Sequence, residues 1–417
     1  MNSDPLRIPS RSPLRWDGRV AIIGAGLGGL CLAQGLRRAG IACDVYERDS
    51  AADSRKQGYR VRINAAGQRA LGRCLSPELA EAFRDTCAVA DNEGLFFDPQ
   101  LAPVAGRAAD TWRPSAVAGA AAAVEPGDLS ADRQTLREVL LGGLDGHVHF
   151  GKSFRRFATD ADGCTSIAFE DGTQARCEVL VAADGVNSQV RAQCWPLAQP
   201  VDTGAVCIYG KTPLTPEIQP RIAPQLRRGT SVVFADGFAL VIDAMRFRPV
   251  RTVRGCALSP TEDYLYWAFI GPRGCFGFDP QRELPPGGPP LGSIVSCLTH
   301  GWHRDLRALF DNADRASLAV MPVRSAVLLR PWTPSAVTIL GHAIHAMSPA
   351  GGLGANTALE DAASLATCLA QVATADLSPL AAIAAYEQDM LARAATALAS
   401  SSRGAQRLFS PNLSAGA

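Results

Sequence analysis

Two glycine-rich segments near opposite ends of the chain constrain its fold more than any other feature of the sequence. The first spans residues 24–29 and has glycine at the three fixed positions of a Gly-x-Gly-x-x-Gly pattern. The second spans residues 341–356 and contains four glycines. Glycine lets a backbone approach a ligand closely because it has no side chain. The two segments together predict that both ends of the chain hold one ligand.

The first segment lies between a predicted strand and a predicted helix. Val20–Ile23 is a short apolar run, typical of a buried parallel strand, that leads directly into the turn. A helix is predicted over Leu30–Ala39, ended by Gly40, and a second strand over Ile41–Tyr46. Glu47 follows about 20 residues after the second glycine, where an acid accepts hydrogen bonds from ribose hydroxyls. This context predicts a dinucleotide-binding unit.

Each residue of the turn has a predicted role. Gly24 allows the tight turn, Gly26 lets the backbone approach a pyrophosphate, and Gly29 lets helix and strand pack closely. At the start of the helix, around Leu27, free N–H groups and a partial positive charge face the phosphates. The turn alone does not distinguish FAD from NAD.

Composition narrows the class of protein. The 417 residues allow two or three domains, and 47% hydrophobic with 19% charged residues fits an ordinary soluble protein. The net charge of +1 gives no reason to expect nucleic acid or an anionic membrane as a partner. The 12 cysteines include no Cys-x-x-Cys pair, and neither a signal peptide nor a membrane span is evident. We therefore predict a cytoplasmic protein with reduced cysteines.

The middle of the chain predicts a second unit. β-rich runs separated by proline- and glycine-rich loops indicate a mostly antiparallel sheet, and a helix near Leu136 is predicted with Ser130 as its cap. The chain then returns to the first unit through a strand and two alanine-rich helices. The strands are predicted at Ala205–Tyr209, Ser231–Phe234, Ala239–Ala244, Tyr264–Ile270 and Ala336–Leu340, and the helices at Ile294–Phe310, Asn356–Val372 and Leu380–Ser401.

Three segments in a fixed order carry a resemblance to a known family. They are the turn at 24–29, the run Val179–Gly185 followed by Ser188 and Arg191, and Leu340–Asn356. In this order and spacing the chain resembles the group A flavin monooxygenases, which include aromatic hydroxylases and tetracycline-modifying enzymes. The resemblance extends from about residue 19 to residue 401.

The resemblance implies an α/β fold like that of p-hydroxybenzoate hydroxylase. A Rossmann-like FAD-binding domain is expected at 17–85, 125–198 and 325–402, after a disordered tail at 1–16. A mostly antiparallel substrate-binding sheet domain is expected at 86–124 and 199–324, and the chain is expected to end with helices. A pocket is then expected at the interface of the two domains.

The resemblance also implies which residues hold FAD. Glu47 would contact the adenosine ribose, Arg48 would lie near the adenine, and Arg133 would contact FAD from its helix. Arg60 is expected on an arm near the flavin, where core packing or solvent exposure is the alternative. The other residues implied to bind cofactor are Gly24, Gly26, Leu27, Gly29, Asp184, Gly185, Pro349, Gly352, Leu353, Gly354, Ala355 and Asn356.

One position departs from the family pattern. The second glycine-rich segment of the family begins with Gly-Asp, whereas this chain has Gly341-His342. The aspartate normally accepts a hydrogen bond from a ribityl hydroxyl, and a neutral imidazole also has one acceptor nitrogen. Three interpretations stay open: His342 replaces the acid as an FAD ligand, it weakens FAD binding, or it marks a chain that has left flavin chemistry.

Other candidate residues are weaker. Tyr209, Tyr264 and Tyr266 lie on strands of the predicted sheet, where they would contact substrate, pack in the core or face solvent. His147 and His149 share one strand face, but no third ligand is evident, so we predict no metal site. No catalytic base is identified.

The resemblance implies an FAD-dependent monooxygenase reduced by NADPH or NADH as a transient partner. Oxygen would add to the reduced flavin to give a C4a-hydroperoxide, which would hydroxylate or epoxidise an aromatic or polycyclic small molecule. The alternatives are an FAD oxidoreductase without oxygen insertion and a fold-retaining protein with non-redox pocket chemistry, which His342 alone favours. Substrate, choice of nicotinamide and oligomeric state stay open.

Overall fold

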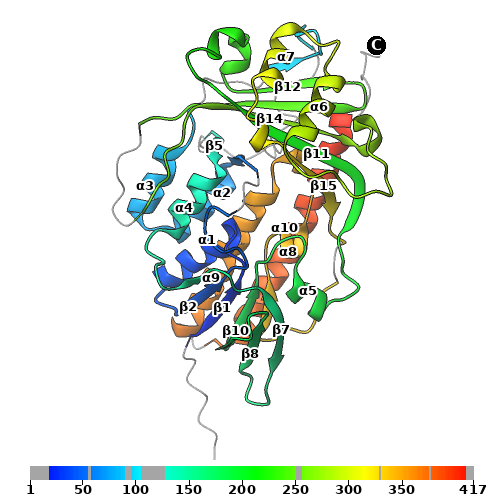
Figure 1. Ribbon diagram of the computed structural model, residues 1–417. Helices are drawn as coiled ribbons and strands as arrows, with labels where there is room; N and C mark the ends of the chain where they lie inside the picture. The colour runs from blue at the N-terminus through cyan, green and yellow to red at the C-terminus, as the bar shows by residue number, and fades with distance from the viewer. Residues whose placement is uncertain are drawn as a thin grey trace, which may run out of the picture.

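The computed structural model describes residues 18–54, 58–89, 95–104, 127–249, 256–327, 330–374 and 377–409. A parallel sheet with its helices forms one half of this part of the chain, and a mostly antiparallel sheet forms the other, across the top of the view (Figure 1). The predicted tail at 1–16 lies outside the described residues.

The parallel sheet brings the three sequence motifs to one edge. Its order is β16-β10-β1-β2-β6, with every pair parallel, and Ile23, Ala182 and Ile339 lie side by side near the ends of β1, β10 and β16. Because parallel strands end at a common edge, the loops that follow β1, β10 and β16 meet there. The strands are β1 (Val20–Ile23), β2 (Cys43–Tyr46), β6 (Val148–His149), β10 (Val179–Ala182) and β16 (Val337–Ile339).

Helices from both ends of the chain cover this sheet. A β-carbon on Gly28 would lie 2.8 Å from the Leu340 side chain and 3.3 Å from that of Ala358, so the first helix and the late helix α9 pack closely. The helices of this half are α1 (Leu27–Arg38), α2 (Ala65–Cys74), α3 (Pro77–Thr86), α4 (Arg133–Leu141), α5 (Gln189–Cys194), α8 (His342–His345), α9 (Gly354–Thr374) and α10 (Pro379–Phe409).

Two smaller sheets complete this half. The meander β7 (Phe154–Thr159), β8 (Thr165–Phe169) and β9 (Gln174–Cys177) packs on the parallel sheet, with the rings of Tyr46 and Phe169 4.8 Å apart. The antiparallel pair β3 (Arg60–Ile63) and β5 (Leu129–Asp132) leads into α4.

The second large sheet has the order β15-β11-β14-β13-β12-β4, antiparallel except where β12 meets β4. Its outer face packs under α6 and α7, which lie above it in Figure 1. Its inner face carries Cys207, Tyr209, Val241 and Ala268 and faces Tyr59 of the other half. The elements are β4 (Leu95–Phe97), β11 (Val201–Pro213), β12 (Thr230–Ala235), β13 (Phe238–Met245), β14 (Tyr264–Pro272), β15 (Ala319–Ser325), α6 (Pro289–Leu298) and α7 (Arg304–Asp311).

Three local predictions were wrong. The single helix predicted at 294–310 is α6 and α7, which are separated by a break that contains Gly301. The N-cap of α4 is Asp132, whose carboxylate accepts from Thr135 N at 3.0 Å, rather than Ser130, which lies in β5. The run from His147 to Phe157, whose alternation predicts one part of a hairpin meander, is instead divided, because His149 belongs to β6 of the parallel sheet.

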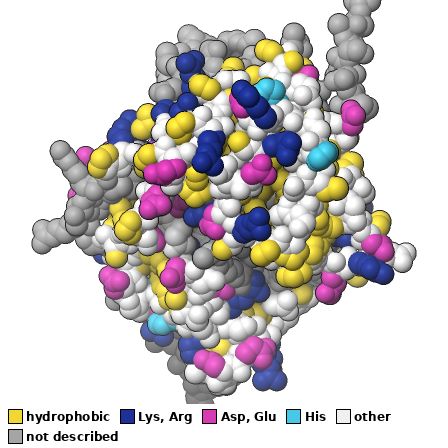
Figure 2. All heavy atoms as spheres, turned by 45° about the horizontal axis from the view of Figure 1, so that its top comes forward, with side chains coloured by type: hydrophobic (Ala, Val, Ile, Leu, Met, Phe, Trp, Pro, Cys, Tyr) yellow, Lys and Arg dark blue, Asp and Glu magenta, His cyan; other side chains and the backbone are white. Residues whose placement is uncertain are grey.

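The face turned forward in Figure 2 carries Lys and Arg, Asp and Glu, and apolar side chains interspersed. This mixture agrees with the net charge of +1. Within the described ranges, no helix has the length and hydropathy needed to cross a membrane.

Candidate functional site

The turn after β1 has the geometry of a phosphate-binding cradle. Gly24 has φ +109°, and a β-carbon there would lie 2.4 Å from the carbonyl oxygen of Ala183. A β-carbon on Gly29 would lie 2.1 Å from the oxygen of Gly24, whereas one on Gly26 would meet nothing within 4 Å. Packing therefore requires glycine at positions 24 and 29. Gly26 faces open space, as expected of a glycine whose backbone contacts a ligand.

A cavity of about 540 Å³ opens beside this turn. It extends from the start of α1 to the ends of β11 and β14, so both halves of the molecule contribute to its walls. Its lining includes Ala25, Gly26, Leu27, Glu47, Asp49, Asp53, Gly58, Tyr59, Asp132, Arg133, Gln134, Thr135, Arg137, Lys211, Pro213, Ser259, Pro260, Thr261, Glu262, Asp263, Tyr264 and Asp314.

Arg133, the first residue of α4, presents an uncompensated positive charge to the cavity. Its side chain is exposed where it lines the cavity, and no carboxylate of the described residues lies within ion-pair distance. Burial by surrounding protein, and then the charge of Arg137, lower the pKa of Arg133. Arg137 differs because its guanidinium donates to the oxygen of Ala25 at 2.9 Å and lies 3.8 Å from Glu47. Arg133 is thus the guanidinium that is free to meet an anion.

Glu47, which directly follows β2, stabilises the turn through hydrogen bonds. Its carboxylate accepts from Ala25 N at 2.8 Å and from Asp49 N at 3.0 Å, and it lines the cavity. A ribose contact by Glu47 stays a prediction. Arg48 is exposed and lies outside the set of cavity-lining residues, so its adenine contact also stays a prediction.

The loop after β10 contributes an acid with one unused oxygen. Oδ2 of Asp184 accepts from Gln189 N at 2.8 Å, while Oδ1 is buried without a hydrogen-bond partner among the described residues. Burial raises the pKa of Asp184, against the hydrogen bonds of Ser188 and nearby backbone N–H groups. Arg191 joins this loop to the next motif by donating to the oxygen of Ala343 at 2.6 Å.

The loop after β16 is held by a buried carboxylate that sequence reasoning missed. Asp361 of α9 accepts from Gly341 N at 3.1 Å, contacts Nε2 of His345 at 2.6 Å and accepts from Nε of Arg393 at 3.0 Å. Burial works to raise the pKa of Asp361, but the charge and hydrogen bond of His345 and the charge of Arg393 lower it overall. The sequence signal that could have identified Asp361 was an aspartate inside an alanine-rich helix.

His342 lies against the start of α9. A β-carbon on Gly354 would be 2.4 Å from Cε1 and 2.8 Å from Nε2 of the imidazole, so only glycine fits beneath the ring. Burial, then the charges of His345 and Arg133, lower the pKa of His342 to about 3. The imidazole is therefore neutral at ordinary pH.

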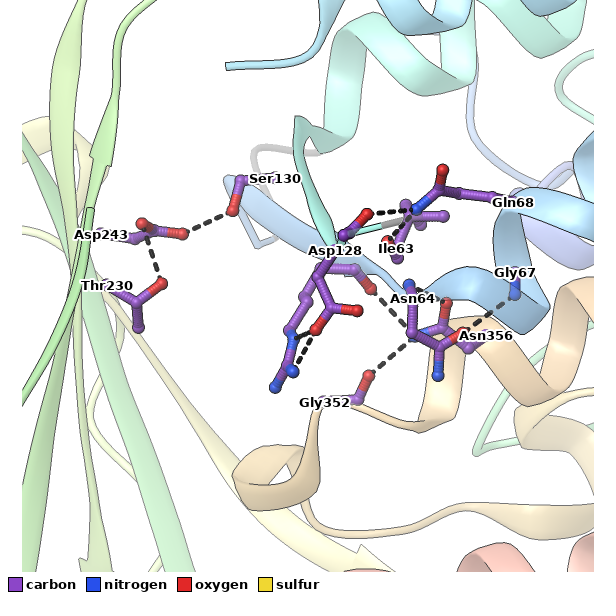
Figure 3. A network of polar contacts seen from close by, with 12 residues as sticks. Ile63, Asn64, Gly67, Gln68, Asp128, Ser130, Thr230, Asp243, Gly352 and Asn356 are labelled. Carbon is purple, nitrogen blue, oxygen red and sulfur yellow. Dashed lines mark hydrogen bonds and ion pairs between the residues drawn. The ribbon is translucent and has the colours of Figure 1, made fainter. Parts of the chain in front are cut away.

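Asn356 holds the start of α9 against the β3–α2 loop. Its amide donates to the oxygens of Arg62 and Gly352, both at 2.9 Å, and accepts from Asn64 N at 3.0 Å (Figure 3). The side chain is thereby fully used within the protein, and what remains for a ligand is the backbone. The N–H groups of the first turn of α9 have no acceptor within the helix.

The remaining residues of this segment surround the start of α9. Pro349 is exposed, and Gly352, Leu353, Gly354 and Ala355 are half-buried.

Arg60 is already paired across the two halves of the molecule. Its Nε lies 2.6 Å from Oδ2 of Asp243 on β13. Asp243 also accepts from Ser130 at 2.7 Å and, through Oδ1, from Thr230 at 3.2 Å (Figure 3). This network joins β3 and β5 to the large sheet. The FAD contact of Arg60 stays a prediction.

The three candidate tyrosines occupy different environments. Tyr264 is 4% exposed and donates to Asp132 at 2.8 Å, so its hydroxyl serves the interface. Tyr209 is buried against the ring of Tyr59, whereas Tyr266 is half-buried on the inner face. Contact of any of them with substrate stays a prediction.

Lys211 was not singled out from the sequence. Its ammonium lies 5.3 Å from the ring of Tyr59 and 5.7 Å from that of Tyr264, at the wall of the cavity.

The histidines considered for a metal lie elsewhere. Nε2 of His149 is 3.2 Å and Nδ1 of His147 is 3.7 Å from Oδ1 of Asp44, and all three side chains are more than a third exposed. They form a surface cluster beside β2.

The residues fit a flavin dinucleotide. The open backbone at Gly26, the uncompensated guanidinium of Arg133 and the unused oxygen of Asp184 lie on loops that meet at one sheet edge. An anionic diphosphate would be neutralised by the first two, and a ribose or ribityl hydroxyl would satisfy the third.

Comparison with known proteins gives a consistent picture. The family model described as "FAD binding domain" matches residues 17–204 and 304–401. The chain is 36% identical to the dual O-methyltransferase/FAD-dependent monooxygenase of Cercospora beticola over 94% of this chain and 46% of that protein. It is 27% identical to the aurachin C monooxygenase/isomerase of Stigmatella aurantiaca over 92% of this chain and 88% of that protein.

A solved structure agrees with these sequence matches. A FAD-containing protein from Photorhabdus luminescens is 32% identical, with a TM-score of 0.77 over 94% of this chain and 98% of that one. The chain spans about half the length of the dual-function fungal relatives it matches.

Proposed function

The chain belongs to the FAD binding domain family and has the fold of its flavoprotein monooxygenases, and from this premise we propose that it is an FAD-dependent monooxygenase reduced by NADPH or NADH. One observation carries the proposal furthest. Arg133 presents an uncompensated cation to the same cavity that the open backbone at Gly26 borders. Binding of a diphosphate needs both the cation and the open backbone. A protein that used the pocket for a ligand without a diphosphate would need neither.

The chain's own residues would bind and orient the cofactor. N–H groups at the start of α1 and the guanidinium of Arg133 would hold the diphosphate, and the first-turn N–H groups of α9 would face the ring system. Bound FAD supplies the redox chemistry with oxygen. The proposed cofactor-binding residues are Gly24, Gly26, Leu27, Gly29, Glu47, Arg48, Arg60, Arg133, Asp184, Gly185, His342, Pro349, Gly352, Leu353, Gly354, Ala355 and Asn356.

The large sheet would cover the reacting region and exclude water. Its inner face combines tyrosines with small apolar side chains such as Cys207, Val241 and Ala268. Such a surface suits an aromatic or polycyclic substrate. Arg60 and Asp243, which form an ion pair, neutralise each other.

A phenolic substrate is the class that we favour. The fungal relatives join an O-methyltransferase and an FAD-dependent monooxygenase in one chain. O-methylation uses a hydroxyl group, and hydroxylation of an aromatic ring creates one, so the two activities act naturally on one phenolic scaffold. We also propose a cytoplasmic location, which the free cysteines of the described residues support.

The test begins with the purified protein and added FAD. Stoichiometric FAD binding, oxidation of NADPH or NADH that a phenolic substrate accelerates, and transfer of one labelled atom from ¹⁸O₂ into product are the expected results. Reduction and reoxidation without label in any product would indicate an oxidase or reductase. A protein that takes up no FAD would refute the proposal.

A further inference from the structure

His342 lies at the positive end of a long helix of the candidate site. Its imidazole packs on Gly354, the first residue of α9, and the positive end of that 21-residue helix lies at this point. After burial and the charge of His345, the charge of Arg133 also lowers the pKa of His342. The positive end of α9 and the charge of Arg133 therefore both act on this side chain.

Among the described residues, one carboxylate, that of Asp361, opposes this charge, since it acts to raise the pKa of His342. Asp361, the acid of α9 that senses His342, is fully buried and already contacts His345 and Arg393. The imidazole itself carries no charge at neutral pH, because the pKa of His342 is lowered to about 3. An aspartate at this position would place a negative charge beside both positive sources.

We propose that His342 tunes the reduction of the bound cofactor: its neutral ring adds no negative charge against the field of Arg133 and α9, and this field favours reduced FAD over oxidised FAD. The inference rests on the proposed function. A hydride from the nicotinamide brings two electrons and one proton to the neutral ring system, so the reduced ring carries one negative charge. A positive field stabilises that anion more than the neutral oxidised form.

The measurable quantity is the ratio of affinities for reduced and oxidised FAD. Adding one negative charge at position 342 should lower this ratio by about tenfold, the order expected for a unit charge nearby at protein-like screening. For a two-electron couple, tenfold corresponds to about 30 mV in the midpoint potential of bound FAD.

The experiment compares wild type, His342→Asp and His342→Asn, each loaded with FAD. The midpoint potential is measured anaerobically against reference dyes. We expect His342→Asp to lower the midpoint potential of bound FAD. The asparagine of His342→Asn has nearly the same size as aspartate but no charge, so this variant should keep an affinity ratio within about threefold of wild type. An unchanged or higher potential in His342→Asp, or an equal fall in both variants, would overturn the proposal.

A second pair keeps the test decisive if His342→Asp does not fold. Arg133→Gln removes one positive source, whereas Arg133→Lys keeps the charge, so only Arg133→Gln should lower the ratio. Where binding is weak, dissociation constants for oxidised and reduced FAD give the same ratio directly. Equal ratios in these two variants would contradict the inference, while wild-type FAD binding and ¹⁸O transfer report separately on the proposed function.

Discussion

The amide of Asn356 shows how one side chain fixes the position of a helix. It makes three hydrogen bonds to backbone groups of two separate segments and is 1% exposed. A buried donor that faces two carbonyl oxygens cannot be replaced by an acceptor without repulsion.

Asn356→Asp should therefore lower the free energy of unfolding by about 2–4 kcal/mol, although it barely changes the shape of the side chain. Urea denaturation measures this loss. Gln371→Glu, at an exposed position of the same helix, serves as the control and should change stability by less than about 0.5 kcal/mol. Equal effects at both positions would mean that the network does not hold α9.

His342 makes a second prediction, which concerns acid stability. Its folded pKa of about 3 lies below the ordinary value of 6.5, so as pH falls the unfolded chain takes up the proton first. Stability should then fall between about pH 6.5 and 3, by at most about 1.4 kcal/mol per pH unit from this group. Unfolding free energies of wild type and His342→Asn, compared at pH 7 and pH 5, isolate the effect. A difference that is constant with pH would contradict it.

At the scale of elements, different glycines of the β1–α1 turn serve packing and cofactor binding. Gly29 touches backbone, whereas Gly26 borders open space and has an ordinary negative φ of −77°. The same substitution should therefore lower mainly stability at Gly29 and mainly FAD affinity at Gly26.

Gly29→Ala should destabilise the protein by more than about 3 kcal/mol, since its methyl group would overlap the oxygen of Gly24. Gly26→Ala should leave stability within about 1 kcal/mol and weaken FAD binding by about tenfold or more, because the methyl group would occupy the approach to the diphosphate. Thermal unfolding and a fluorescence titration with FAD measure the two quantities. Tight FAD binding by Gly26→Ala would place the diphosphate elsewhere.

At the scale of the whole molecule, a buried ion pair joins the two halves. Asp243 of the large sheet holds Arg60 and Ser130 of the other half, and its side chain is 3% exposed. Removing one partner of such a pair leaves an uncompensated buried charge.

Asp243→Asn should cost about 3–5 kcal/mol of unfolding free energy. Asp202→Asn is the matched control. Asp202, on β11 of the same sheet, pairs with Arg273 but is 42% exposed, so this change should cost less than about 1 kcal/mol. Urea titration of both variants measures the contrast. Similar losses would show that the Arg60–Asp243 pair does not join the halves.

Local pattern predicted much of this molecule. The first turn, Asp184-Gly185 and the second glycine-rich segment were recognisable because each follows a short apolar strand and uses residues that the backbone geometry requires. Asp361 with Arg393, Arg60 with Asp243, and Lys211 between two tyrosine rings were not recognisable. Each depends on side chains that meet only after distant segments pack, and an isolated charged residue does not indicate its partner.

The order of the parallel sheet has a consequence for biosynthesis. β1 and β10 are made long before β16 and α9, yet the cradle needs all of them at one edge. A growing chain that has emerged only through β15 carries the first turn without the helix that covers it. We therefore expect cofactor loading to wait until translation of α9 is finished, so that flavin supply acts on chains that already contain α9 and not on shorter nascent ones.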